Sequence, residues 1–120
     1  MAFFLGDGDR EADAVRITYL SLAILDLVEI HAYIAAENSD AAQRVGSKLR
    51  ESIHSLEQFP NLGKPGRVFG TRELNTSRIG ETTYIVVYRV KRDMIQILRV
   101  LPGMRDIDTI LDEGFPTEEN

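Results

Sequence analysis

The chain has 120 residues, of which 43% are apolar and 28% are charged, a balance typical of one globular domain. It contains no cysteine, which excludes a disulfide framework, a cysteine-ligated metal and a thiol nucleophile. The net charge of −5 is unevenly spread, because residues 60–105 carry +6 whereas residues 1–14 carry −3 and residues 106–120 carry −6. Local charge sets the field that a partner meets, so the basic block could attract an acidic partner that the whole chain would not.

The two ends of the chain differ in character from its middle. Residues 1–14 mix glycines with acids and show no periodicity, so we expect a flexible arm, and we expect residues 106–120 to form an acidic tail. Residues 15–105 should form the folded domain. The longest early apolar run, residues 2–5, is too short for a signal peptide or a membrane span, so we expect a cytoplasmic protein without a membrane partner.

The first part of this domain predicts a strand followed by two helices. Residues 15–20 alternate apolar and polar side chains, as a short strand does. Residues 21–37 predict an amphipathic helix with the apolar stripe Ile24, Leu27, Ile30 and Ile34. Asp40 is predicted to cap a second helix, which ends at Phe59 and carries the stripe Val45, Leu49, Ile53 and Leu56. The short connection between them predicts an antiparallel hairpin of helices.

The second part of the domain predicts a loop and three strands. Residues 61–70 are rich in glycine and proline and predict a loop, and residues 72–77, 82–90 and 94–101 predict strands. The last two strands are joined as a hairpin. Residues 84–88 are apolar on both faces, which favours a central strand. The order β-α-α-β-β-β therefore predicts an α+β fold, with an antiparallel helical hairpin packed on a small, mainly antiparallel sheet.

Familiar catalytic and cofactor-binding motifs are missing from the sequence. The glycines of residues 63–70 follow a helix and precede a strand, the reverse of a phosphate-binding loop. His31 and His54 fall in different predicted helices without the spacing of metal ligands, so we expect neither a metal nor another cofactor. No serine lies in a nucleophile elbow and no histidine lies in the sheet half, which disfavours triad chemistry.

Arginines and tyrosines in the sheet half form the candidate binding site. Arginine makes bidentate contacts with phosphate or carboxylate, and tyrosine offers a stacking face, as recognition of an RNA or an acidic peptide requires. The alternative is that the tyrosines belong to the core and the arginines are merely solvated. The candidates are Arg67, Arg72, Arg78, Tyr84, Tyr88, Arg89, Arg99 and Arg105.

The register of the last hairpin decides which of these side chains can act together, because neighbours on a strand point to opposite faces. A two-residue turn at residues 92–93 would place Arg99 opposite Val86, on the face of both tyrosines. A three-residue turn at residues 91–93 would place it opposite Ile85, on the face of Arg89. The sequence leaves both registers open.

These residues resemble the RelE/ParE toxins of type II toxin–antitoxin systems, and most closely the ParE-like, plasmid-stabilisation branch. The resemblance covers roughly residues 17–105. It rests on several short motifs in the right order: Ala23-x-x-Asp26-Leu27-x-x-Ile30, Leu56-x-x-Phe59-Pro60-x-x-Gly63, Gly70-Thr71-Arg72-Glu73-Leu74, Tyr84-Ile85-Val86-Val87-Tyr88-Arg89, Ile95-x-Ile97-Leu98-Arg99 and Gly103-x-Arg105.

The resemblance implies a growth-inhibiting toxin that is neutralised by an antitoxin, whose C-terminal segment wraps around it. We expect that segment to carry an apolar stripe and several acids, and to lie along a groove lined by Arg72, Arg89 and Arg99. Such binding should weaken with salt, because charges at the rim of an interface are screened.

The resemblance also bears on the cellular target. Members of the ribonuclease branch cut ribosome-bound mRNA with the help of basic residues, but this sequence has Ile85 where an arginine is expected and Pro102 where a histidine is more usual. ParE-like members instead resemble poisons of DNA gyrase and need no nuclease residues. We therefore favour a gyrase poison over a ribosome-dependent endoribonuclease. The acidic ends also allow an inactive relative that only binds its antitoxin.

Overall fold

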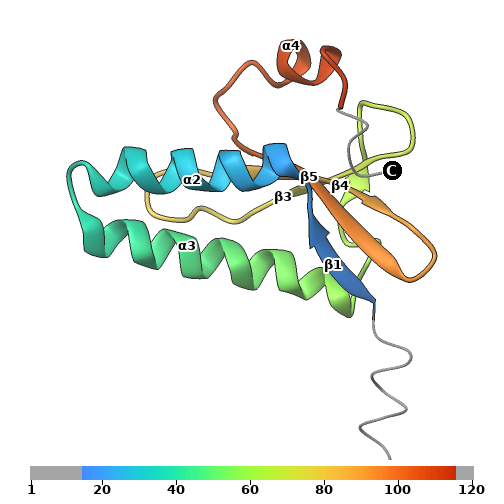
Figure 1. Cartoon of the computed structure of the whole chain (residues 1–120), viewed down its shortest axis with the longest axis horizontal. Coiled ribbons are helices and arrows are strands. Elements are labelled where there is room, and N and C mark those ends of the chain that lie inside the picture. The colour runs from blue at the N-terminus through green and yellow to red at the C-terminus, as the bar shows by residue number, and fades with distance from the viewer. Residues whose placement is uncertain (1–14, 116–120) are drawn as a thin grey trace, which may run out of the picture.

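The computed structural model describes residues 15–115, which form helices on both faces of one five-stranded sheet (Figure 1). The strands are β1 (Arg16–Tyr19), β2 (Lys64–Pro65), β3 (Arg72–Asn75), β4 (Tyr84–Val90) and β5 (Met94–Pro102), in the order β1-β5-β4-β3-β2. β1 is parallel to β5 and the other pairs are antiparallel. The helices are α2 (Ser21–Ala35), α3 (Ser39–His54), the short 3-10 turn η1 (Ser55–Glu57) and α4 (Ile107–Asp112). The expected α+β fold is confirmed.

Helices α2 and α3 run side by side as the predicted antiparallel hairpin and enclose the larger core with the sheet (Figure 1). Val45, Leu49, Ile53 and Leu56 are buried there as predicted, and Leu27 and Ile34 are half-buried against the same core. Ile24 was expected in this core but is 50% exposed, and Ala23 is buried in its place. Ile24, Leu27 and Ile30 follow one another at intervals of three residues, and each interval falls about 60° short of a full helical turn. Two such intervals place Ile24 on a different face of the helix from Ile30.

The helix ends also differ in detail from the expectation. Asn38, not Asp40, caps α3, and its side-chain oxygen accepts a hydrogen bond from the backbone N–H of Ala41 at 2.9 Å. Asp40 lies in the first turn of the helix instead, where its negative charge is attracted to the positive end of the helix dipole. The regular helix stops at His54, and the 3-10 turn η1 leads the chain toward Phe59.

β4 is the middle strand of the sheet and is buried on both faces, as its apolar sequence predicted. The β4–β5 turn follows the two-residue register, because Val90 pairs with Ile95 and the N–H of Lys91 bonds to the carbonyl of Met94. A β-bulge then shifts the pairing by one residue, so that Arg99 faces Val87. Neither register considered from the sequence places Arg99 there.

Helix α4 covers the second face of the sheet and builds a smaller core on it. Ile107 and Leu111 of α4 pack with residues of β4 and β5, including Val87 and Leu98. Residues 106–115 therefore belong to the fold, whereas they were expected to form part of an acidic tail. Ile107 and Leu111 lie one helical turn apart and are both buried, which is the spacing of an amphipathic helix. The exposed acids around them gave the segment the composition of a tail. The predicted arm, residues 1–14, lies outside the described residues.

Candidate functional site

Arg99 is held in a buried ion pair with Asp26 of α2. The Nε and Nη2 atoms of Arg99 lie 2.8 and 2.9 Å from the two carboxylate oxygens of Asp26. The backbone N–H of Val100 also donates to Asp26, at 2.9 Å. The pairing of β5 with β1 ends at Ile97, so Asp26 takes the place of a strand partner for Val100. Hydrogen bonding to Asp26 raises the pKa of Arg99. Arg99, expected to face a partner, instead joins α2 to the sheet, and only 15% of its side chain is exposed.

Arg67 forms a second bidentate pair, with Glu73 of β3. Its Nε and Nη2 atoms each lie 2.9 Å from a carboxylate oxygen of Glu73, whose side chain is 1% exposed. The Nη1 atom of Arg67 reaches Asp108 of α4 at 2.8 Å. The hydrogen bonds to these two carboxylates raise the pKa of Arg67. Arg67 therefore connects the loop before β3 to both the sheet and α4.

The Arg67 pair makes the stability of the fold depend on pH. Hydrogen bonds from Arg67 hold the pKa of Glu73 below its ordinary value of 4.5, despite the opposing effect of burial. Because the folded pKa is depressed, the ionised carboxylate stabilises the fold above the ordinary pKa, and this contribution is lost as pH falls through the lower folded value.

We expect Glu73→Gln to lower the free energy of unfolding most at neutral pH, with the difference from the wild type shrinking below pH 4.5. Urea unfolding of both proteins across this range measures the effect. A difference between the two proteins that grows in acid would contradict the assignment.

The two candidate tyrosines are core residues, as the alternative interpretation held. Tyr84 and Tyr88 are 4% and 0% exposed, so neither offers a stacking face to a partner. The hydroxyl of Tyr88 accepts a hydrogen bond from the N–H of Gly63 and donates one to the carbonyl of Pro60. Burial raises the pKa of Tyr84 above 10.0, which keeps its phenol protonated at neutral pH. Both side chains act in the fold.

The remaining candidate arginines do not form the expected groove. Arg72 donates to the carbonyls of Gly63 and Asn61 beside β2, and Arg89 donates to Gln96 across the β4–β5 pair. Arg72 shares its sheet face with Leu74 of the larger core, whereas Arg89 shares its face with Val87 of the smaller core. β4 lies between the strands that carry Arg72 and Arg99, and Arg99 is held by Asp26 of α2. These three side chains therefore do not meet on one surface, and Arg78 and Arg105 are exposed in connecting segments.

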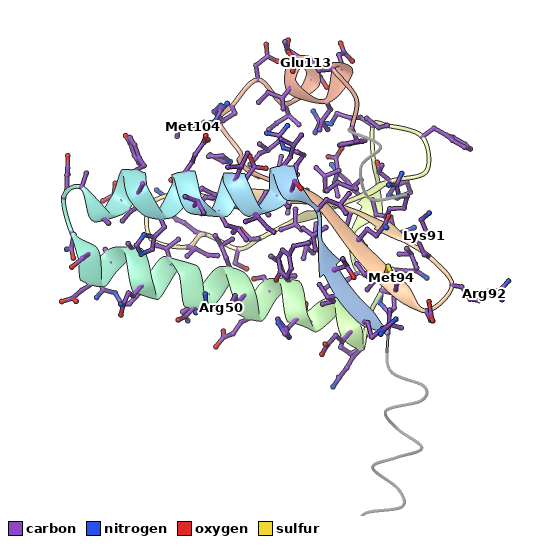
Figure 2. The ribbon with its side chains drawn as sticks, in the orientation of Figure 1. Arg50, Lys91, Arg92, Met94, Met104 and Glu113 are labelled. Carbon is purple, nitrogen blue, oxygen red and sulfur yellow. The ribbon has the colours of Figure 1, made fainter. Side chains whose placement is uncertain are left out.

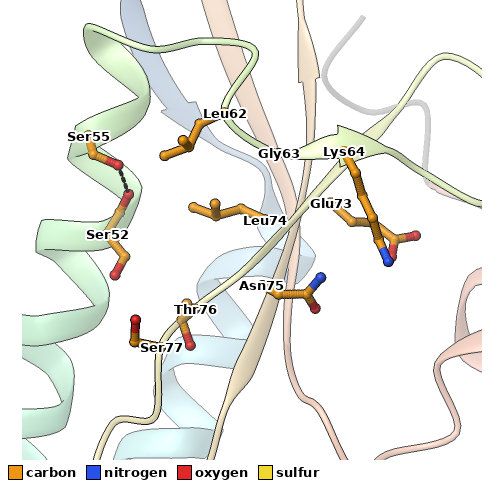
Figure 3. A pocket seen from close by; sticks show the side chains of 10 residues that line it. All are labelled: Ser52, Ser55, Leu62, Gly63, Lys64, Glu73, Leu74, Asn75, Thr76 and Ser77. Atoms are coloured by element: carbon orange, nitrogen blue, oxygen red, sulfur yellow. Dashed lines mark hydrogen bonds between the residues drawn. The ribbon is translucent and has the colours of Figure 1, made fainter.

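One pocket lies between the end of α3 and strands β2 and β3 (Figure 3). It has a volume of about 480 Å³ and is lined mainly by hydroxyl and apolar side chains, among them Ser52, Ser55 and Leu74. Lys64 and Glu73 are its charged residues, and Glu73 is committed to Arg67. The pocket therefore contains no free group that could act as a general base near neutral pH.

Other sites for chemistry are also missing from the described part of the chain. His31 and His54 are exposed on the helical hairpin, and the Nδ1 atom of His54 lies 3.9 Å from a carboxylate oxygen of Glu57. Across residues 15–115, no cluster of acids and histidines could hold a metal ion. None of the helices in this range is long and apolar enough to cross a membrane.

The outer side of α2 exposes an apolar stripe, of which only Ile24 was predicted to lie in the core. Ile24, Leu25 and Val28 are 50%, 53% and 57% exposed and occupy neighbouring positions on one helix face. The opposite face of α2 carries the buried Ala23 and Asp26. A contiguous exposed apolar patch is typical of an interaction surface.

Comparison with known proteins identifies the family of this chain. The family model described as "ParE toxin of type II toxin-antitoxin system, parDE" matches residues 17–107. The chain is 38% identical over 86 residues to "Putative toxin Y4kP" of Sinorhizobium fredii (strain NBRC 101917 / NGR234), covering 72% of this chain and 85% of that protein. It also matches a solved structure, "Chromosomal ParDE TA system from P. aeruginosa", with a TM-score of 0.62 and 26% identity over 73% of this chain and 95% of the other. The chain therefore belongs to the ParE toxin family of type II toxin–antitoxin systems.

Proposed function

We propose that this ParE-family toxin inhibits growth by poisoning DNA gyrase and is neutralised by a cognate antitoxin. A poison of this kind acts by binding the enzyme and its cleaved DNA, so the toxin itself needs no catalytic residues. The proposal is supported mainly by two ion pairs within the fold, which join Arg99 of β5 to Asp26 and Arg67 of the loop before β3 to Glu73.

The candidate residues of the sheet half are poorly suited to the acid–base chemistry of RNA cleavage. A ribonuclease must activate a 2′-hydroxyl and stabilise or protonate the leaving oxygen, and each contribution is typically worth 10²–10⁴-fold in rate. Arginine exchanges protons poorly because its pKa lies above about 12, and Tyr84 and Tyr88 are buried. Ile85, at the position where the ribonuclease branch is expected to carry an arginine, is itself 8% exposed in the smaller core.

The proposed antitoxin partner is supported by the similarity to a ParDE system and by the exposed stripe on α2. An amphipathic antitoxin segment could bury Ile24, Leu25 and Val28. Arg72, Arg89 and Arg99 do not share a surface, so they do not line the groove expected from the sequence. We therefore place the apolar side of the antitoxin segment on the stripe of α2.

A supercoiling reaction tests the proposal directly. Purified toxin should prevent gyrase from supercoiling relaxed plasmid, and linear plasmid should accumulate after protein denaturation, because the cleaved complex is trapped. Topoisomerase I, which relaxes the supercoiled form of this plasmid, should be unaffected and serves as the control. Adding the cognate antitoxin should restore supercoiling. Normal supercoiling at a large excess of folded toxin would contradict the proposal.

A further inference from the structure

Basic side chains gather on the sheet face opposite the helical hairpin, at the end that carries the β4–β5 turn. Val87 marks this face because it packs in the core beneath α4, and alternation places Arg89 and Lys91 on the same face. Arg16 joins them through its pairing with Met94, next to Lys91. Lys64 joins them through Glu73, which pairs with Val87. We call Arg16, Lys64, Arg89 and Lys91 the basic face.

None of the cations of the basic face is held in an ion pair within residues 15–115. The ion pairs in this range use Arg67, Arg99 and His54 instead. Arg89 donates only to the neutral amide of Gln96. Lys64 lies near Glu73 (Figure 3). The carboxylate of Glu73 is already held by Arg67. Figure 2 shows Lys91 at the outer end of the β4–β5 hairpin, together with Arg92 of the turn.

A tight, hydrogen-bonded turn beside the basic face presents one aromatic side chain. The backbone N–H and hydroxyl of Thr71 both donate to the carbonyl of Val68, at 3.1 and 2.6 Å, and close a turn around Phe69 and Gly70. Gly70 has φ +84°, a value that type II turns require at this position. Val68 packs into the smaller core, so the turn lies on the same side of the sheet as the basic face. Phe69 itself is fully exposed.

We propose that the basic face and Phe69 contact DNA, with the cations on phosphates and Phe69 stacked against a base. Uncompensated cations beside an exposed aromatic ring match the two recurring needs of a nucleic-acid site, phosphate neutralisation and base stacking. The choice of DNA rests on the proposed function, because a toxin that traps gyrase on cleaved DNA binds beside an interrupted base stack. Such a break exposes the base surface that Phe69 needs.

Binding of a short fluorescein-labelled duplex, read by fluorescence anisotropy with the full chain, tests the basic face. Four phosphate contacts predict a slope of about −3.6 for log K against log salt, hence a loss of about a hundredfold between 50 and 200 mM salt. The Lys64→Gln/Lys91→Gln variant should reduce the slope to about −1.8. Arg44→Gln/Lys48→Gln, which removes the same charge from the exposed side of α3, should behave as the wild type.

A nicked duplex tests Phe69. Phe69→Ala should weaken binding to nicked DNA roughly 5- to 150-fold, the range of one lost base–aromatic stack, and should affect intact duplex less. Tyr33→Ala is the matched control, because Tyr33 is an aromatic residue that is 85% exposed on α2. Circular dichroism and thermal unfolding establish that all variants are folded.

The outcomes separate this inference from the proposed function. In one outcome, the wild type inhibits gyrase, and the basic-face and Phe69 variants bind DNA and inhibit gyrase as strongly as the wild type. The proposed DNA contact is then wrong and gyrase poisoning stands. If the wild type leaves gyrase active while these variants lose DNA binding, the contact stands and the gyrase target is wrong. Variants that keep DNA binding but lose antitoxin binding would show that this surface serves a protein partner, which overturns the inference.

Discussion

Replacing Asp26 by alanine is expected to lower the free energy of unfolding by about 3–5 kcal/mol, the typical cost of leaving one partner of a buried ion pair alone. The substitution leaves the Arg99 guanidinium and the Val100 N–H without their shared acceptor in a largely buried region. Urea unfolding followed by circular dichroism measures the change.

Two companion variants identify the cause of this loss. Glu29→Ala removes an exposed carboxylate from the same helix and should change stability by less than about 0.5 kcal/mol. Asp26→Ala/Arg99→Ala should be less destabilised than the sum of the single variants, because no lone charge remains buried. Strict additivity of the two substitutions would show that the pair does not act as a unit.

Leu49→Ala is expected to cost about 2–5 kcal/mol of stability, because it opens a cavity in the core between the helical hairpin and the sheet. Leu49 of α3 is 1% exposed and packs among the core residues contributed by both layers. Thermal or urea unfolding reports the loss.

Leu25→Ala is the matched control, since the same side chain on α2 is 53% exposed. Its substitution should change stability by about 0.5 kcal/mol or less. If the two variants unfolded at the same urea concentration, the assignment of inner and outer helix faces would be wrong.

The architecture could be predicted from periodicity, whereas the face of α2 could not be predicted from apolar residues alone. The helical hairpin, the central β4 strand and the β4–β5 hairpin all follow from patterns of 3.6 or 2 residues. The apolar stripe predicted for α2 did not include Asp26, although Asp26 is buried. Its position three residues after Ala23 and four before Ile30 places it on the inner face, and that spacing was the available signal.

The candidate site was predicted less well because it depends on contacts between distant parts of the chain. The sequence supplied the basic residues but not their partners, and Arg67 and Arg99 find carboxylates on other elements. The β-bulge that moves Arg99 opposite Val87 leaves no local pattern from which the register could be read. Phe69 was passed over because an isolated exposed aromatic residue has no periodic signature, and only the fold places it beside the basic face.

The most direct test of the gyrase assignment is to quantify covalent gyrase–DNA complexes and mRNA 5′ ends in the same cells after brief expression of the toxin. Gyrase poisoning predicts that covalent complexes rise before growth stops, while the mRNA ends match those of cells that carry an empty vector. Cuts at defined codons of translated mRNA, without a rise in covalent complexes and abolished by Arg105→Ala, would contradict it and identify the protein as a ribosome-dependent endoribonuclease.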